Sequence, residues 1–131
     1  MKSDDELFRK VMADKFARYV GIQLLEAREG YARVELTLNN NHLNGVNMIQ
    51  GGVIFTLADY AFALASNSGN CPTVALNANI SYFKTPVGKI IRAEAKEISV
   101  RNRISGYQVD ITDEDGSLIA SFSGLGFRKQ K

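Results

Sequence analysis

The sequence predicts a single α+β domain in which one antiparallel β-sheet wraps around a buried helix. The main observation is a segment, residues 53–65, that is apolar almost all round a helix, as expected of a helix enclosed on most sides. Most other segments have strand patterns separated by turn signals. A chain of 131 residues can build one core and is too short for a second independent one, so we take residues 1–131 as one domain.

The composition argues against several kinds of partner. Hydrophobic residues make up 45% of the chain and charged residues 23%, and no apolar run reaches the ~18 residues that suggest a membrane span. Acids and bases are interleaved at a net charge of +2, without the basic stripe that nucleic-acid binding requires. The first residues lack a signal-peptide pattern, and the one cysteine cannot form an internal disulfide. We therefore expect a cytoplasmic protein with no membrane or nucleic-acid partner.

The first half of the chain should contain a helix and a β-hairpin. An amphipathic helix is predicted from apolar residues that recur on one helical face, namely Phe8, Met12, Phe16 and Tyr19 with Val20. Strands are predicted at residues 22–28 and 31–38, because the second alternates strictly and Glu29-Gly30 supplies the turn between them. A polar stretch, residues 39–47, then leads to the buried helix.

Four strands are predicted in the second half of the chain, at residues 73–82, 90–100, 104–112 and 118–127. The first has one apolar face, because apolar residues occupy every second position from Val74 to Tyr82. The second changes its inward phase near Lys96-Glu97, as a β-bulge requires. The last two strands flank residues 113–116, Asp-Glu-Asp-Gly, which is the turn signal of a hairpin.

Asp59 is the only formal charge in the buried helix, and no basic residue lies within two helical turns of it. An ionised carboxylate taken out of water costs on the order of several kcal/mol unless it is paired, hydrogen-bonded or neutralised. This position suggests chemistry more than packing, with Asp59 as general base or nucleophile. The alternative is a structural carboxylate. Thr56, one turn earlier, can bond either Asp59 or its own backbone carbonyl.

A glycine pair, Gly51 and Gly52, stands at the start of the same helix. N–H groups there have no side chain in front of them and the helix dipole favours negative charge, so they can act as an oxyanion hole in acyl transfer. The alternative is that the pair only provides a sharp turn or close packing. Asp59 lies about 10 Å further along the helix, so one subunit cannot easily join the two groups. Two such helices, antiparallel across a two-fold axis, would form two composite sites in a dimer.

The segment 42–63 resembles the core motif of the hotdog-fold acyl-CoA thioesterases of the phenylacetate-pathway (PaaI-like) type. The likeness is carried by Asn44, the Gly51-Gly52 pair, Leu57-Ala58-Asp59 and Ala61-Phe62-Ala63, and the order of elements along nearly the whole chain also resembles the family's. The family fold is a curved antiparallel sheet around one long helix, usually a dimer of such subunits paired into a tetramer. The resemblance implies hydrolysis of an acyl-CoA thioester, without a redox or metal cofactor, by a homodimer at least and usually a homotetramer.

By this resemblance Asp59 is the catalytic carboxylate, Gly51 the backbone donor to the thioester oxygen, and Asn44 a polar group that orients water or the carbonyl. Two positions depart from the family pattern. Gln50 stands where many relatives have His, and because Gln donates hydrogen bonds but does not titrate, a positioning role survives and a proton shuttle does not. Ala75 takes the place of a Ser or Thr that binds the attacking water in some members.

Further contacts with the substrate are predicted at the helix start and at a basic turn, namely at Gly52, Thr56, Arg101 and Arg103. The two arginines are candidate contacts for the phosphates of coenzyme A. Lys84 and Lys89, which flank a loop after the third strand, are candidates for the same role. For all four basic side chains the alternative is an ordinary solvated charge.

Two other functions remain open at this stage. One is a non-catalytic acyl-CoA binding domain, in which Asp59 is structural. The other, a hotdog dehydratase or hydratase, is less favoured because it usually needs a His where this chain has Gln50. His42 is expected to be a surface or turn residue and Cys71 an incidental loop or strand-edge residue, and one His with one Cys rules out the usual metal clusters. The acyl group that is cleaved stays undecided.

Overall fold

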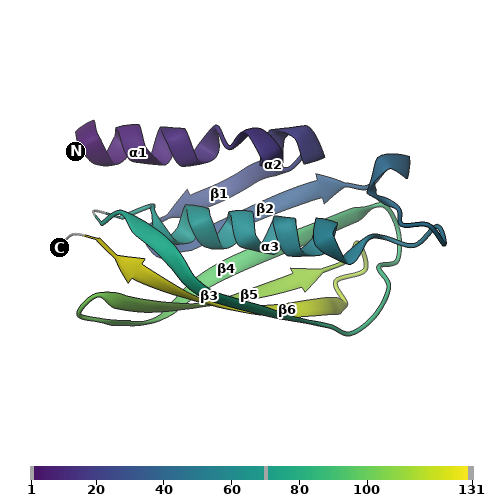
Figure 1. Ribbon diagram of the computed structural model, residues 1–131. Coiled ribbons are helices and arrows are strands. Elements are labelled where there is room, and N and C mark those ends of the chain that lie inside the picture. Colours follow the sequence, from purple (N-terminus) through teal and green to yellow (C-terminus); the bar gives the residue numbers. More distant parts are fainter. Residues whose placement is uncertain (1, 70, 130–131) are drawn as a thin grey trace.

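Six antiparallel strands form one curved sheet, and the long helix α3 lies along its concave face (Figure 1). The computed structural model describes residues 2–69 and 71–129. The strand order is β1-β2-β4-β5-β6-β3, which leaves β1 and β3 at the two edges. The elements are α1 (Lys2–Met12), α2 (Lys15–Val20), β1 (Gln23–Arg28), β2 (Tyr31–Thr37), a short 3-10 helix (Asn40–His42), α3 (Gly51–Ser66), β3 (Thr73–Tyr82), β4 (Ile90–Arg101), β5 (Ile104–Thr112) and β6 (Leu118–Arg128). The predicted order of elements is confirmed.

The core lies between α3 and the sheet. Strand β2 turns its alternate apolar residues toward the helix, and these are fully buried, as the strict alternation predicted: Ala32, Val34 and Leu36. On the helix, the ring of Phe62 packs edge-on against Tyr107 of β5, with 5.4 Å between centroids, and lies 5.9 Å from Phe122 of β6. Because burial of large apolar side chains is the main stabilising term in folding, this enclosure of α3 accounts for most of the core.

The predicted N-terminal helix is interrupted. It ends at Met12, and a second helix begins at Lys15, capped by Asp14, whose Oδ1 accepts a hydrogen bond from the backbone N–H of Ala17 at 2.9 Å. Three residues assigned to the apolar face are exposed, Met12 at 37%, Phe16 at 59% and Tyr19 at 86%. The single continuous helix was therefore a wrong prediction. In Figure 1 α1 and α2 follow one another, and both contact α3.

Of the four shifts of register between the described strands, two bear on the predicted patterns. The pairing of β4 with β5 shifts between Glu97 and Ser99, which confirms the predicted change of phase. The pairing of β3 with β6 also shifts, between Ala75 and Asn77. The uninterrupted alternation predicted for β3 is therefore wrong, since residues before and after the bulge change face.

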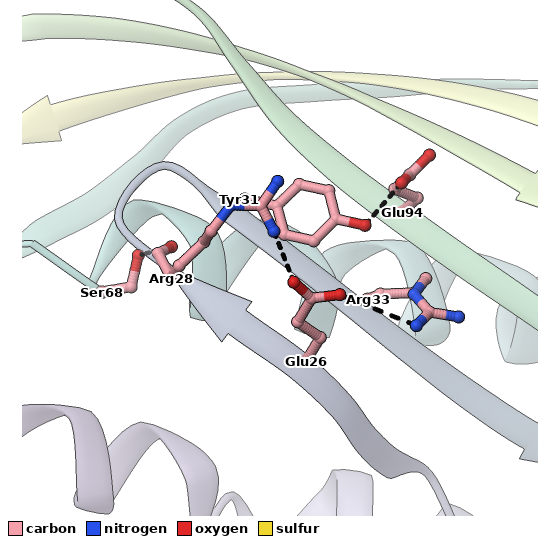
Figure 2. A network of polar contacts seen from close by, with 6 residues as sticks. All are labelled: Glu26, Arg28, Tyr31, Arg33, Ser68 and Glu94. Carbon is pink, nitrogen blue, oxygen red and sulfur yellow. Dashed lines mark hydrogen bonds and ion pairs between the residues drawn. The ribbon is translucent and has the colours of Figure 1, made fainter.

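A polar network ties β1, β2 and β4 to the end of α3 (Figure 2). The hydroxyl of Tyr31 donates to Glu94 at 2.5 Å, and the guanidinium of Arg28 lies 3.8 Å over the Tyr31 ring while it pairs with Glu26. Ser68, just after α3, donates to the backbone carbonyl of Arg28 at 2.7 Å. The outer face of this sheet edge is therefore fixed by polar contacts rather than by apolar packing.

His42 was expected on the surface or in a turn, and of these the turn is observed, because it ends the short 3-10 helix and is buried, at 5% exposure. Its Nδ1 accepts a hydrogen bond from the backbone N–H of Asn39 at 3.0 Å, and its Nε2 donates to the carbonyl of Val20 at 2.8 Å. The histidine thus joins the turn before α3 to the end of α2. Both ring nitrogens are used in the structure, which leaves it no role as a proton carrier.

Helices long and apolar enough to span a membrane are absent from the part of the chain that the structure describes.

A substitution at Gly124 can test the packing around Phe62. A Cβ at this position would lie 3.0 Å from Cε1 of Phe62 and 3.1 Å from its Cδ1, and that ring is confined by Tyr107 and Phe122. We predict that Gly124→Ala lowers the free energy of unfolding by about 1–3 kcal/mol, the usual cost of overpacking a core, as measured by urea denaturation. Gly45→Ala is the control, because nothing lies within 4 Å of its added Cβ. Equal stability of the two variants would contradict the packing described.

Candidate active site

The start of α3 offers one free backbone donor. Gln50 is the N-cap, and its Oε1 accepts a hydrogen bond from the N–H of Gly52 at 2.5 Å. The N–H of Val53 donates to the carbonyl of Gln50 at 3.0 Å. Only the N–H of Gly51, the first residue of the helix, has no hydrogen-bond partner among the described residues. The candidate oxyanion donor is therefore Gly51 alone, and the expectation that Gly52 also presents a free N–H was wrong.

Gln50 keeps donors of its own. Because its Oε1 is held by Gly52, its Nε2 is the polar atom that remains for another partner. The side chain is exposed, at the same helix end as the Gly51 N–H. An amide there can polarise a bound oxygen but cannot take up a proton. This agrees with the positioning role expected from the sequence.

Tyr82 is a residue of this site that the sequence reasoning missed. It ends β3, and its hydroxyl donates to the carbonyl of Gly51 at 3.0 Å. A Cβ on Gly51 would lie 3.3 Å from Cζ of the Tyr82 ring, so the glycine is needed for a close approach of this ring. The tyrosine thereby holds the first turn of α3 from outside the helix.

Asp59 lies half-buried on α3 and makes no hydrogen bond or ion pair with any residue that the structure describes. Burial raises the pKa of its carboxyl group, and the negative charge of Asp14 raises it further. Thr56 does not bond it, because the Thr56 hydroxyl donates to the carbonyl of Gly52 at 2.7 Å. Of the two alternatives for Thr56, the backbone bond is therefore the one observed. Carboxyl groups with a raised pKa cluster at functional sites, which makes Asp59 a candidate.

One chain does not bring Asp59 to Gly51. The helix α3 is continuous from Gly51 to Ser66, and eight residues along a helix correspond to about 12 Å. A bound acyl group could not be held by both at once. Within one chain the two groups are therefore not brought together.

Asn44 shapes the loop before α3. Its Oδ1 accepts hydrogen bonds from the backbone N–H groups of Val46 at 2.9 Å and Met48 at 3.0 Å, and its own N–H donates to the carbonyl of Met48 at 2.7 Å. The amide nitrogen of this exposed side chain has no partner in residues 2–69 and 71–129. Asn44 can therefore offer a donor while its oxygen holds the loop.

Two hollows adjoin the start of α3. One, of about 290 Å³, is lined by Gly51, Tyr82, Phe83 and Lys84, and the other, of about 320 Å³, is lined in part by Lys89. Both are also lined by Ile49, Thr85 and Pro86. The loop that follows β3 therefore forms a common side of the two hollows, and it brings Lys84 to the hollow lined by Gly51 and Lys89 to the other one.

The two arginines lie elsewhere. Arg101 and Arg103 flank the β4–β5 turn, which sits at the end of the sheet where Phe127 pairs with β5 and Arg128 with β3. Tyr82, at the other end of β3, is the residue that touches Gly51. Arg103 donates to the carbonyls of Arg128 at 3.0 Å and Lys129 at 2.8 Å. Within one chain these arginines are not brought together with Gly51.

Groups of three or more His, Cys, Asp or Glu side chains that could hold a metal ion do not occur in the described parts of the chain. Cys71 is buried near the end of α3, next to a small cavity lined by Tyr107, Glu29 and Glu97. This cavity lies at the end of α3 opposite to Gly51.

A model of the thioesterase superfamily matches residues 46–120, more than half of the chain. A protein of Archaeoglobus fulgidus is 40% identical over 116 residues, which cover 88% of this chain and 75% of that protein. The acyl-coenzyme A thioesterase PaaI of Escherichia coli K12 is 31% identical over 116 residues, covering 88% of this chain and 83% of that enzyme.

The solved structure of the E. coli PaaI protein superposes with a TM-score of 0.87 at 27% identity and covers 98% of this chain and 95% of its own. A mutant of the phenylacetic acid degradation protein PaaI from Thermus thermophilus has a TM-score of 0.82 at 36% identity, covering 88% of this chain and 99% of its own. The resemblance and the fold class predicted from the sequence are confirmed. The chain belongs to the thioesterase superfamily and has the hotdog fold of its PaaI-like members.

Proposed function

We propose that this protein hydrolyses an acyl-CoA thioester to the free acid and CoA at a site formed by two subunits. The observation that carries the proposal is the half-buried carboxylate of Asp59, unpaired among the described residues, on the same helix as the free N–H of Gly51. A carboxylate and a backbone donor are the two groups that acyl transfer from a thioester requires. The kinship with an acyl-coenzyme A thioesterase of E. coli supports the same reaction.

In this mechanism the N–H of Gly51 donates to the thioester carbonyl oxygen, where negative charge develops as the carbonyl carbon is attacked. The partner's carboxylate, equivalent to Asp59, either removes a proton from the attacking water or attacks the carbon itself. The carbon–sulfur bond then breaks, and CoA leaves as a thiolate that takes up a proton. In the second route water afterwards hydrolyses the mixed anhydride. A raised pKa makes the carboxylate a stronger base than an exposed aspartate.

The edge strand β3 supports the shared site. It has no strand neighbour on one side, and its exposed apolar residues include Val74, Leu76 and Tyr82. An edge of this kind readily pairs with another chain. Antiparallel pairing of two β3 strands across a two-fold axis would run the two α3 helices antiparallel and bring each Asp59 toward the other chain's Gly51. Pairing of two such dimers into a tetramer follows from the family resemblance.

The roles of the remaining predicted residues follow from this arrangement. Gln50 and Asn44 donate to the carbonyl oxygen or to water through their amide nitrogens. Arg101 and Arg103 reach the phosphates of coenzyme A only if they come from a neighbouring subunit, because within one chain they lie at the far end of the sheet. This assignment makes the substrate a ligand of more than one chain.

Replacement of the carboxylate is the first test. We predict that Asp59→Asn lowers hydrolysis by about 10³-fold or more, because it removes the charge needed by a base or nucleophile, in an assay of CoA thiol release from aryl and aliphatic acyl-CoA esters. The variant should melt at or above the wild-type temperature, since it relieves burial of an unpaired charge. Near-normal turnover would refute the role of Asp59. If the wild type hydrolyses none of the esters but still binds them, the alternative of a non-catalytic acyl-CoA binding domain would be favoured.

The donor can be removed with little change of shape. Proline is tolerated at the first position of a helix and lacks an N–H, and the extended Gln50 before it is compatible with proline. We predict that Gly51→Pro lowers kcat by about 10²–10³-fold. Gly51→Ala is the matched control, because it meets Tyr82 in the same way but keeps its N–H. Equal losses in the two variants would exclude the N–H as the cause.

The shared site has a test of its own. When Gly51→Pro and Asp59→Asn chains are unfolded together and refolded, each mixed dimer should contain one intact site, so about a quarter of wild-type activity should return. Each variant refolded alone should stay inactive. Failure to recover activity from a mixture that forms mixed dimers in sedimentation would rule out a site built from two chains.

The pH dependence follows from the neighbours of Asp59. The reaction needs the ionised carboxylate, so the raised pKa should place the acid limb of kcat/KM above the usual range of an aspartate. We predict that Asp14→Asn moves this limb to lower pH, because it removes a negative charge that raises the pKa, while Asn still caps α2. An unmoved or upward-shifted limb would show that another group controls it.

A further inference from the structure

The loop between β3 and β4, residues 83–89, lines part of both hollows, one of which is also lined by Gly51. Residues 83–89 form neither a helix nor a strand. At its start the N–H of Phe83 donates to the carbonyl of Ile119 at 2.8 Å, and at its end the carbonyl of Lys89 accepts from the N–H of Leu38 at 2.7 Å. What holds the middle of the loop is a side chain of the β5–β6 turn.

That side chain is Asp113, which is completely buried, at 0% exposure. Its Oδ2 accepts hydrogen bonds from the backbone N–H of Val87 at 2.9 Å and from Nζ of Lys84 at 3.4 Å. Its Oδ1 accepts from the N–H groups of Asp115 at 3.1 Å and Ser117 at 3.0 Å. The bond from Val87 is the main cause of a pKa below the usual range, so the carboxylate is ionised at neutral pH.

The two oxygens of Asp113 have separate tasks. Oδ1 closes the hairpin turn of which Asp113 is itself a part, as Asp and Asn commonly do in turns. Oδ2 reaches out to the 83–89 loop. A neighbouring residue adds a second link, because Oε1 of Glu114 accepts from the N–H of Lys89 at 2.8 Å. The β5–β6 turn is thus a fixed support for the loop that lines the hollows.

The loop has the chemistry of a surface for the arm of coenzyme A. Phe83 and Pro86 supply apolar surface, together with Ile49 across the hollow. Lys84 and Lys89 supply two ammonium groups, and the side chain of Lys84 is 41% exposed even though it pairs with Asp113. An apolar channel with cations beside it suits a pantetheine chain that ends in phosphates.

We propose that Asp113 is a positioning residue for substrate binding, which fixes Lys84 and the backbone at Val87 so that the 83–89 loop receives the CoA arm beside Gly51. The proposal rests on the proposed function, since it assigns part of the same substrate. Asp113 itself touches no substrate. Asp113 therefore affects the affinity for CoA esters, whereas the bond-breaking step depends on Asp59 and Gly51.

Asp113→Asn separates the two tasks. The amide oxygen can still accept from Asp115 and Ser117 and keep the turn, whereas the amide nitrogen would face two donors, the N–H of Val87 and Nζ of Lys84. With an acyl-CoA that the wild type hydrolyses, we expect KM to rise about ten-fold and kcat to stay within about two-fold. An unchanged KM, or a loss confined to kcat, overturns the proposal.

A truncated substrate distinguishes a specific loss of binding to the CoA arm from general damage to the active site. The N-acetylcysteamine thioester of the same acyl group lacks the nucleotide and most of the arm, so Asp113→Asn should leave its kcat/KM unchanged. Equal losses with both substrates overturn the proposal. Tyr31→Phe is the control variant, because it removes a hydrogen bond to Glu94 on the outer face and should leave KM for both substrates unchanged.

A second variant decides the question if Asp113→Asn does not fold. Glu114→Ala removes the link to Lys89 from an exposed position and should raise KM for the CoA ester in the same direction by a smaller factor. No change of KM in this variant would then overturn the proposal. If the wild type hydrolyses no ester, the proposed function fails, but calorimetric titration with CoA still tests the role of the loop. About ten-fold weaker CoA binding by Asp113→Asn than by the wild type supports the proposal, and equal binding overturns it.

Discussion

The structure depends on the enclosure of α3 by the sheet. A helix that is apolar nearly all round cannot lie on a surface, so the sheet must curve about it and present apolar side chains to it. The aromatic group of Phe62, Tyr107 and Phe122 fills the space that the small residues leave. The same enclosure sets the electrostatics, because a carboxylate on this helix loses water and its pKa rises, while the helix start remains open.

Periodic patterns made most of the fold predictable. The alternation of β2 and the apolar run of α3 are local, so both elements were found from sequence alone. The break at Asp14 was missed because the apolar spacing continues across it, and a pattern of spacing does not reveal a cap in its middle. The bulge in β3 was missed because its apolar residues keep their alternation across it, whereas the apolar residues of β4 change phase at their bulge.

The chemistry of the site was predictable to the extent that it depends on residue type and position along one helix. Asp59 and Gly51 were proposed in this way, since a lone charge and a bare helix start are visible in the sequence. Tyr82 and Asp113 were not, because each acts on a segment more than twenty residues away. The bond from Gly52 to Gln50 is local, but glutamine is an uncommon N-cap, and so no pattern pointed to it.

The Gln50 cap has a consequence for how this site can change over evolution. A single amide closes the first turn of α3 through its oxygen, and its nitrogen stays available at the same helix end. Under the proposed function, folding and reactivity share this one side chain. Substitutions that keep only the acceptor preserve the helix and lose the donor. Among neutral side chains of this length, glutamine alone has both an acceptor oxygen and a donor nitrogen. Substitution of residue 50 is therefore limited by the helix cap and by the donor at once.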